Sequence, residues 1–378
     1  MRIGITCHHT YGGSGTVATE LGMALAKRGH QVHFVTFAEP YRLQFDPNIY
    51  LHQVDVMHYP LFDHPPTTLS LAAKMAETIC TEKLDLLHVH YAIPHATAAY
   101  LALKLCPEHN VRLVTTLHGT DITLVGQDPS YFSITRFSIE QSDVVTAVSQ
   151  WLKDQTLSRF KVAHPIEVIY NSVDTERFRR VSVPACQRAR YAPGGEPILV
   201  HISNFRPLKR VTDVIRAFAL VRKRMAAKLL MIGDGPHRMP AQEVALELGV
   251  MGDVWFLGKQ DRVELFLSLA DLFLLPSEHE SFGLAALEAM ACEVPVIASR
   301  AGGLVEVIED GVSGHLVEVG DTEMMAELAT RVLKDQELAA RIRAAALDRV
   351  HRLFSADKIV AEYEQLYRTA LSSPKHQS

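Results

Sequence analysis

Two glutamates eight positions apart, Glu280 and Glu288, are the residues of this sequence whose spacing most directly suggests chemistry. An apolar run at 272–275 precedes the first, and a helix that contains the second is predicted to begin at about Phe282, with Ser281 as its N-cap. Carboxylate pairs hydrolyse glycosides when they stand roughly 5 to 9.5 Å apart, whereas eight residues of continuous helix rise roughly 12 Å. We therefore expect two separate hydrogen-bonding roles along one elongated ligand. Two solvated acids beside a helix start are the simpler alternative.

Basic side chains follow another predicted strand, at residues 198–202. Asn204, Arg206 and Lys209 come directly after it, just before the next helical pattern. Guanidinium and ammonium groups beside the free N–H groups of a helix start form a good diphosphate site. The sequence therefore predicts an anion site here, and the alternative is a solvated basic turn.

Taken together, these motifs resemble those of the retaining glycosyltransferases of family 4, which have the GT-B fold. The stretch ESFGLAALE, residues 280–288, is similar to the E-x7-E signature of that family, and Gly302-Gly303 resembles its glycine-rich turn. The resemblance implies that Glu280 holds sugar hydroxyls and that Glu288 holds the ribose of the nucleotide. The other residues that it assigns to the donor in this region are Phe282, Gly283, Leu284 and, at the base, Gly258.

The diphosphate site follows the family pattern only in part. Family members usually carry Arg and then Lys five residues later, but here Asn204 stands five positions before Lys209. Lys209 therefore takes the firmer assignment, with Arg206 as the substitute for the missing arginine. Both are assigned to catalysis with Glu280, and Asn204 is retained among the donor-binding residues.

A glycine-rich loop near the N-terminus predicts a second ligand-binding region. A strand at 2–6, the residues Gly13, Ser14 and Gly15, and then a helix form a unit that brings backbone N–H groups to an anion, and we assign these three residues to donor binding. A dinucleotide site is the competing interpretation, because Gly13-x-Gly15-x-x-Ala18 is followed by Glu39. Against it, four other residues, 8–11, separate the strand from the glycines. An NAD(P)-dependent oxidoreductase stays open as an alternative.

His118 follows the predicted strand at 112–116, in the sequence TLHGTD. This segment resembles the one in which the family's histidine contacts the transferred sugar. The resemblance implies a catalytic role for His118 as a hydrogen-bonding group near the anomeric carbon, without proton abstraction. The alternative is a purely structural histidine.

Several stretches, among them GITCHHTYGGSG and LHVHYAIPHA, resemble family members that act in bacillithiol biosynthesis. This resemblance implies transfer of N-acetylglucosamine from UDP-N-acetylglucosamine to the hydroxyl of L-malate, with no metal or other cofactor. For the dianionic acceptor we assign Ser14, Tyr91, Thr120 and Arg136, the last as a bidentate carboxylate ligand. Another small, lipid or polysaccharide acceptor remains an alternative, as does a non-catalytic sugar-nucleotide sensor.

The bulk properties of the chain set its class. Strands that alternate with helices over 378 residues predict an α/β protein with two Rossmann-like, doubly wound parallel-sheet domains, which in the GT-B fold face each other across a cleft. We expect an acceptor domain at 1–170, joined by the C-terminal helix 357–373, and a donor domain at 171–356. A net charge of −5 gives no reason to expect nucleic-acid binding.

Cysteine usage and hydropathy predict the compartment. The five cysteines are scattered without a C-x-x-C pair, which favours a reducing environment and argues against structural zinc. We see neither a signal peptide nor an apolar run long enough to span a membrane. We therefore expect a cytoplasmic protein that does not bind membranes; its oligomeric state stays open, a homo-oligomer included.

Overall fold

The computed structural model describes residues 1–10, 12–57, 59–61 and 63–374, so Tyr11 of the predicted first loop lies outside the described residues. The chain divides into two compact units. The first comprises Met1–Ser172 and resumes at Ala356, and the second is Val173–Ser355. The corresponding boundaries expected from the sequence are 170/171 and 356/357.

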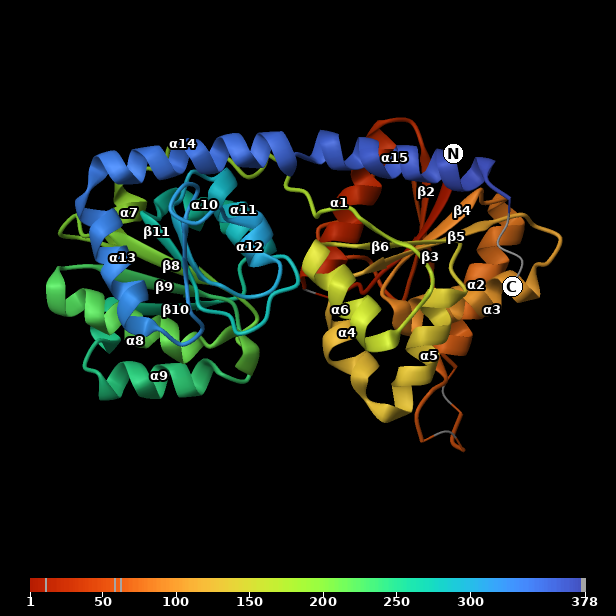
Figure 1. The fold of residues 1–378 in the computed structure, drawn as a ribbon, viewed down its shortest axis with the longest axis horizontal. Helices are drawn as coiled ribbons and strands as arrows, with labels where there is room; N and C mark the ends of the chain where they lie inside the picture. The colour runs from red at the N-terminus through yellow and green to blue at the C-terminus, as the bar shows by residue number, and fades with distance from the viewer. Residues whose placement is uncertain (11, 58, 62, 375–378) are drawn as a thin grey trace. The chain divides into compact units, whose positions relative to one another are not determined.

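The first unit is a seven-stranded parallel sheet with helices on both faces (Figure 1). Its strands are β1 (Arg2–Thr6), β2 (Gln31–Thr36), β3 (Ile49–Gln53), β4 (Leu86–His90), β5 (Arg112–Leu117), β6 (Val144–Ala147) and β7 (Ile166–Val168). Its helices are α1 (Gly13–Lys27), α2 (Thr67–Glu82), α3 (Thr97–Leu105), α4 (Thr120–Thr123), α5 (Pro129–Glu140), α6 (Gln150–Phe160) and α15 (Ala356–Ser372), with short turns η1 (Ala92–Ala96) and η2 (Val125–Gln127).

Alternation along the strands of this sheet builds two cores, one on each face. Phe34 packs with α1 and α15, whereas the next residue, Val35, packs with α2 and α3 on the opposite face. Successive side chains of a strand point to opposite faces, so a strand in a sheet covered on both sides is buried on both sides. β4 is buried along its whole length, its two histidines included. A buried hydrogen bond joins the last helix, α15, to β4: the Tyr367 hydroxyl and His88 Nδ1 share a hydrogen bond of 2.7 Å.

The second unit is a six-stranded parallel sheet, also covered on both faces (Figure 1). Its strands are β8 (Ile198–Ile202), β9 (Lys228–Ile232), β10 (Val254–Gly258), β11 (Leu272–Leu275), β12 (Val296–Ser299) and β13 (His315–Val317). Its helices are α7 (Ala185–Tyr191), α8 (Val211–Arg224), α9 (Arg238–Glu247), α10 (Val263–Leu269), α11 (Leu284–Ala291), α12 (Leu304–Val307), α13 (Thr322–Lys334) and α14 (Gln336–Leu353), with the turns η3 (Pro207–Lys209) and η4 (Met251–Asp253).

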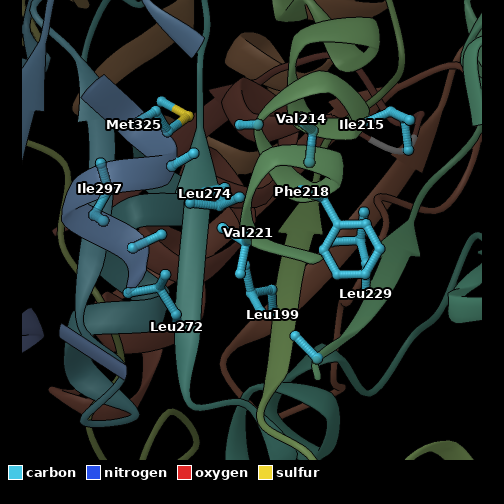
Figure 2. Close-up of a cluster of buried hydrophobic side chains, with 14 of the residues drawn as sticks. Leu199, Val214, Ile215, Phe218, Val221, Leu229, Leu272, Leu274, Ile297 and Met325 are labelled. Carbon is cyan, nitrogen blue, oxygen red and sulfur yellow. The ribbon is translucent and has the colours of Figure 1, made fainter. Parts of the chain in front are cut away.

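Figure 2 shows the core between this sheet and α8. Val214, Phe218 and Val221 recur at helical spacing on one face of α8 and meet the side chains of Leu199 and Leu229 from the sheet. Burying a side chain of this size contributes about 1.5–3 kcal/mol. This core therefore holds α8, and with it the loop that precedes α8, firmly against the sheet.

The two sheets share one strand order over six strands, and the first sheet has β7 in addition. The orders are β3-β2-β1-β4-β5-β6-β7 and β10-β9-β8-β11-β12-β13, so the direction of winding reverses between β1 and β4 and between β8 and β11. In doubly wound sheets, ligands bind beyond the carboxyl ends of the strands at this switch point. The loops that follow these four strands are therefore the expected location of a ligand-binding site.

Two segments differ from the sequence prediction. β3, which pairs in parallel with β2, lies in the stretch 41–68, whose sequence indicates neither a helix nor a strand. α7 lies in the stretch 179–197, which is rich in Arg, Pro and Gly and has little periodicity. Among the residues that the structure describes, no helix has the length and apolar character needed to cross a membrane.

Candidate functional site

Two loops lie next to each other at the switch point of the second unit. β8 and β11 pair in parallel, with Leu199 opposite Leu272, so their carboxyl ends reach the same edge of the sheet. The loop after β8 leads into η3, and the loop after β11 leads into α11. A backbone hydrogen bond of 2.8 Å from Glu278 N to Leu208 O joins the two loops directly.

This junction brings Lys209 and Glu280 together. The Lys209 ammonium contacts Glu280 Oε1, and Ser277 Oγ donates a hydrogen bond of 3.0 Å to the same oxygen. The Lys209 and Glu280 side chains remain 18% and 13% exposed, so the pair is partly withdrawn from water yet still reachable by a ligand. Two residues that the sequence places 71 positions apart thus form one charged site.

A glycine turn supports Glu280 from behind. Gly303 N donates a hydrogen bond of 2.8 Å to the Glu280 carbonyl oxygen. Gly302 has φ +55°, and a Cβ at this position would overlap that same carbonyl oxygen. Only glycine accepts both the left-handed backbone and the close approach, so this turn fixes the main chain of Glu280.

The helix after this loop begins later than predicted. α11 starts at Leu284, and its cap position is Gly283 with φ +104°, so the prediction of Ser281 as N-cap is wrong. A residue with left-handed backbone cannot continue a helix, so the helix does not extend back beyond Gly283. Glu280 therefore lies in the loop and not in the helix. Phe282 is buried edge-on against Phe354, their ring centroids 5.6 Å apart.

The second glutamate lies inside α11. Glu288 is the fifth residue of that helix and is only 6% exposed. Buried carboxylates are uncommon because they lose hydration. Glu288 is therefore a constrained group and differs from the solvated acid of the simpler alternative.

The loop after β8 offers two polar groups that the described protein leaves unsatisfied. Asn204 Oδ1 is buried and has no hydrogen-bond partner among the described residues. Arg206 is exposed, and among those same residues its guanidinium forms no hydrogen bond or ion pair. His201 orients this loop, because Nδ1 bonds Leu274 O and Nε2 bonds Ser203 Oγ, each at 2.8 Å. Burial lowers the pKa of His201 to about 4, so this histidine is neutral at pH 7.

Gly258 ends the outer strand β10. Its φ is +69°, and its carbonyl oxygen accepts a 2.8 Å hydrogen bond from Gly233 N, in the turn after β9. Gly258 therefore lies at a strand end, and its carbonyl oxygen already accepts a hydrogen bond within the protein.

In the first unit, aromatic and histidine side chains gather at the ends of β1, β4 and β5, three adjacent strands. His8 follows β1, Tyr91 follows β4, and His118 follows β5. The ring of Tyr91 lies 4.9 Å from that of His8 and 5.4 Å from that of His118, centroid to centroid. His118 Nε2 shares a 2.8 Å hydrogen bond with Nδ1 of His90, the last residue of β4.

These imidazoles are neutral at physiological pH. Burial lowers the pKa of His118 to about 3 and that of His95 to about 3, and it moves the pKa of His90 well below its usual value. Withdrawal from water disfavours the charged ring, and the crowding of several histidines adds to that effect. His118 can therefore donate or accept a hydrogen bond, but it is a poor proton carrier at pH 7.

Asp121 joins the two loops that carry Tyr91 and His118. Its carboxylate accepts backbone hydrogen bonds from Ala92 N at 3.0 Å, Gly119 N at 2.9 Å and His118 N at 3.3 Å. Burial raises the pKa of Asp121 to about 6, although these bonds act in the opposite direction. Asp121 is thus a buried carboxylate that holds the backbone of both loops through hydrogen bonds.

The remaining predicted residues are spread over the first unit. Gly13, Ser14 and Gly15 form the first turn of α1, and Gly15 lies against the His8 carbonyl oxygen, where a Cβ would not fit. Thr120 begins α4, two residues after His118. Arg136 lies on an exposed face of α5, where its Nε donates a 3.0 Å hydrogen bond to Glu140 Oε1. Arg136 is thus partly neutralised by its own helix.

Comparison with known proteins agrees with this arrangement. Two family models match: "Glycosyltransferase Family 4" over residues 11–177 and "Glycosyl transferases group 1" over residues 186–349. A Bacillus anthracis protein named N-acetyl-alpha-D-glucosaminyl L-malate synthase is 48% identical over 377 residues, covering 100% of this chain and 99% of that protein. The chain belongs to the family 4 glycosyltransferases. It is also 28% identical to a D-inositol 3-phosphate glycosyltransferase of Saccharomonospora viridis, over 96% of this chain and 90% of that one.

Solved structures show the fold of this glycosyltransferase. Sucrose-phosphate synthase from Thermosynechococcus elongatus has a TM-score of 0.81 at 23% identity, over 99% of this chain and 100% of that chain. Anabaena Alr3699/HepE, in complex with UDP and glucose, has a TM-score of 0.81 at 20% identity, over 98% and 100%. The α/β GT-B fold predicted from the sequence is confirmed.

Sequence reasoning missed several residues that shape the glycosyltransferase's strand-end loops. Ser277 bonds Glu280, His90 bonds His118, and Asp121 anchors two loops. The available signals were weak: a second histidine two positions after His88, and an aspartate three positions after His118.

Within the described parts of the chain, two groups of side chains have metal-ligand spacing. They are His33, His52 and Glu82, and Cys80, Glu108 and His109. Neither group contains a residue of the strand-end loops described above, so both lie outside the candidate site.

Proposed function

We propose that this family 4 glycosyltransferase moves N-acetylglucosamine from UDP-N-acetylglucosamine to the hydroxyl of L-malate, with retention of the anomeric configuration. The observation that carries the transferase chemistry is the Lys209–Glu280 contact, which joins the two strand-end loops at a switch point. The substrates come from the 48% identity with the Bacillus anthracis protein, which extends over the full length of both chains. A place at the first step of bacillithiol biosynthesis is part of the same proposal.

In this proposal, the second unit binds the donor. The guanidinium of Arg206 and the ammonium of Lys209 bind the diphosphate, because both extend from the loop after β8. Asn204 Oδ1, buried without a protein partner among the described residues, accepts a hydrogen bond from the donor. Glu280 accepts hydrogen bonds from sugar hydroxyls, and Glu288 accepts them from the ribose.

The first unit binds the acceptor. Malate is a small dianion, so its carboxylates need donors and a cation. Tyr91 and Thr120 follow adjacent strands and supply hydroxyl groups, and Ser14 in the first turn of α1 supplies a hydroxyl near free backbone N–H groups. Arg136 can bind a carboxylate bidentately once its bond to Glu140 opens.

The chemistry rests on charge stabilisation at the leaving group. As the glycosidic bond breaks, negative charge grows on the diphosphate, and Lys209 and Arg206 stabilise that charge. The departing diphosphate takes the proton of the malate hydroxyl, which attacks from the same face. His118 is neutral, and His90 occupies its Nε2. The Nδ1 of His118, for which the described residues supply no partner, is therefore the atom that bonds the transferred sugar. We propose no metal in this step.

The decisive experiment measures UDP release for several UDP-sugars against malate, succinate and other small acids. We expect release with UDP-N-acetylglucosamine and malate, and none with succinate, which lacks the nucleophilic hydroxyl. Proton NMR of the product should show the small anomeric coupling of an α-linkage. A β-linked product, or equal UDP release without malate, contradicts the proposal.

The same assay separates the alternatives. Release with a lipid or glycan acceptor but not with malate would keep the transferase and replace its acceptor. Tight binding of UDP-sugar with no acceptor-dependent release would indicate a sensor. Binding of a nicotinamide cofactor in a fluorescence titration would support the oxidoreductase instead. A cytoplasmic location stays a proposal that rests on the cysteine pattern.

A further inference from the structure

Two cysteines that are separated in sequence lie next to each other at the edge of a core of the first unit. Cys80, near the end of α2, and Cys106, directly after α3, place their Sγ atoms 2.9 Å apart. Cys106 Sγ also donates a 3.4 Å hydrogen bond to the Ala76 carbonyl oxygen, one turn earlier in α2. The Cys106 sulfur therefore lies on the side of α2 where Cys80 projects.

Packing between α2 and α3 holds the Cys106 sulfur in this position. α2 and α3 cover the same face of the sheet, and Cys106 belongs to their shared core with Ala76, Ile79 and Ala102. A disulfide has sulfurs about 2.05 Å apart, so bonding requires the two atoms to approach by roughly 0.9 Å. Side-chain rotation supplies a movement of this size, and neither helix has to shift.

The two thiols differ in access to solvent. Cys80 is exposed, whereas Cys106 is buried and only 3% exposed. A carboxylate oxygen of Glu108 and a ring nitrogen of His109 lie within 4.8 Å of Cys80 Sγ, so polar groups surround the exposed thiol. A small reagent therefore reaches Cys80 first.

We propose that Cys80 and Cys106 form a thiol–disulfide exchange site that takes low-molecular-weight disulfides and closes a reversible internal disulfide. The Cys80 thiolate attacks one sulfur of the reagent, a mixed disulfide forms, and the first reagent thiolate leaves with the proton that Cys80 lost. The Cys106 thiolate then attacks Cys80 Sγ and displaces the second reagent thiolate, which takes the Cys106 proton. Two protein thiols are oxidised, and one small disulfide is reduced to two thiols.

The second step is the slow one at neutral pH. Burial raises the pKa of Cys106 to about 12, and both the neighbouring Cys80 and the charge of Glu108 act in the same direction. The thiolate is the attacking form, and far below its pKa the thiolate fraction rises tenfold per pH unit. The mixed disulfide at Cys80 should therefore accumulate at pH 7, and its closure should accelerate about tenfold per unit between pH 7 and 9.

Closure also changes stability. The bond would join residues 26 positions apart and enclose β4 and Tyr91. A disulfide mainly restricts the unfolded chain, and for a protein of this size we expect the melting temperature to rise by about 4 °C or more.

The test treats the reduced full-length protein with oxidised glutathione, blocks free thiols at timed intervals and maps peptides by mass spectrometry without reduction. We expect a glutathione adduct on Cys80 that disappears as a Cys80–Cys106 peptide appears, with both thiols restored by dithiothreitol. Cys186, which is exposed in the second unit, serves as the matched control and should keep its adduct.

Two variants separate the steps. In Cys106→Ser the Cys80 adduct should persist and the rise in melting temperature should vanish, and in Cys80→Ser the buried Cys106 should stay unmodified. UDP release by Cys80→Ser should match that of the wild type, which shows that the variant is folded. A wild-type Cys80 adduct as persistent as that on Cys186, or closure with no pH dependence, overturns the proposal.

Discussion

Replacing Lys209 with alanine removes the cation that joins the two strand-end loops of the second unit. Its ammonium contacts Glu280 and keeps only 18% exposure, so a ligand charge beside it would be poorly screened. Removing one preorganised donor to a developing oxyanion costs about 2.7–4 kcal/mol. We therefore expect Lys209→Ala to lower kcat about 10²- to 10³-fold. The donor KM should change far less, because the diphosphate gains most of its charge in the transition state.

The fold should tolerate this change. Glu280 keeps the hydrogen bond from Ser277 Oγ, so its carboxylate is not left without a partner when the Lys209 ammonium is removed. UDP release under saturating donor and malate gives kcat, and a melting curve reports folding. Lys223→Ala is the matched control, since Lys223 is an exposed lysine in the last turn of α8. It should behave like the wild type.

A double variant decides how Lys209 acts. If its only role is to hold Glu280, then Glu280→Gln alone should reproduce the loss, and Lys209→Ala/Glu280→Gln should be no worse than the more damaging single change. If it stabilises the leaving group directly, the double variant should be slower than either. A kcat for Lys209→Ala within about twofold of the wild type refutes the leaving-group assignment.

Three further predictions test other parts of the site. Glu288→Ala should raise the donor KM strongly by removing an acceptor of ribose hydroxyls, and Glu280→Ala should mainly lower kcat; similar small effects in UDP-release kinetics would contradict this division. Arg136→Lys should raise the KM for malate far more than that for the donor, because an ammonium cannot fork a carboxylate, and equal changes in both would remove Arg136 from the acceptor site. For Asp121, burial raises the folded-state pKa to about 6 against an ordinary value of 3.8, so its contribution to stability is full below about pH 4 and is lost as pH rises through 6. The loss in free energy of unfolding caused by Asp121→Asn should thus be larger at pH 4 than at pH 7. The difference should be about 3 kcal/mol, which corresponds to a pKa shift of about two units, and urea unfolding at the two pH values measures it. A loss that does not depend on pH would show that Asp121 stays ionised throughout.

Buried parallel strands were predictable because their sequence pattern is simple. β8 coincides with the predicted range 198–202, since a strand covered on both faces is a nearly continuous apolar run between polar loops. β3 was not predicted for the opposite reason. It lies at the sheet edge, its residues are mostly half-buried or exposed, and the sequence IYLHQ has no clear alternation of apolar and polar residues. α7 has only seven residues, too few for a helical period to stand out from an arginine-rich segment.

The sequence did not predict the local backbone geometry at the start of α11. The predicted cap at Ser281 is consistent with the residue type, yet Gly283 has φ +104° and the helix starts after it. Leu304 packs where a Cβ on Gly283 would stand, which shows that a distant segment imposes this turn. A preference of about 1 kcal/mol for a serine cap does not outweigh such packing.

The sequence by itself determined the alternation of buried strands with helices, the likeness to family 4 and the identity of Glu280, Glu288, Lys209 and His118 as residues of interest, because each is a local pattern. Only the tertiary structure decided which of them meet. Lys209 reaches Glu280 because β8 and β11 are neighbours in the sheet, and His90 reaches His118 because β4 lies beside β5. Strand order is set by burial summed over a whole sheet, and no single segment carries that information.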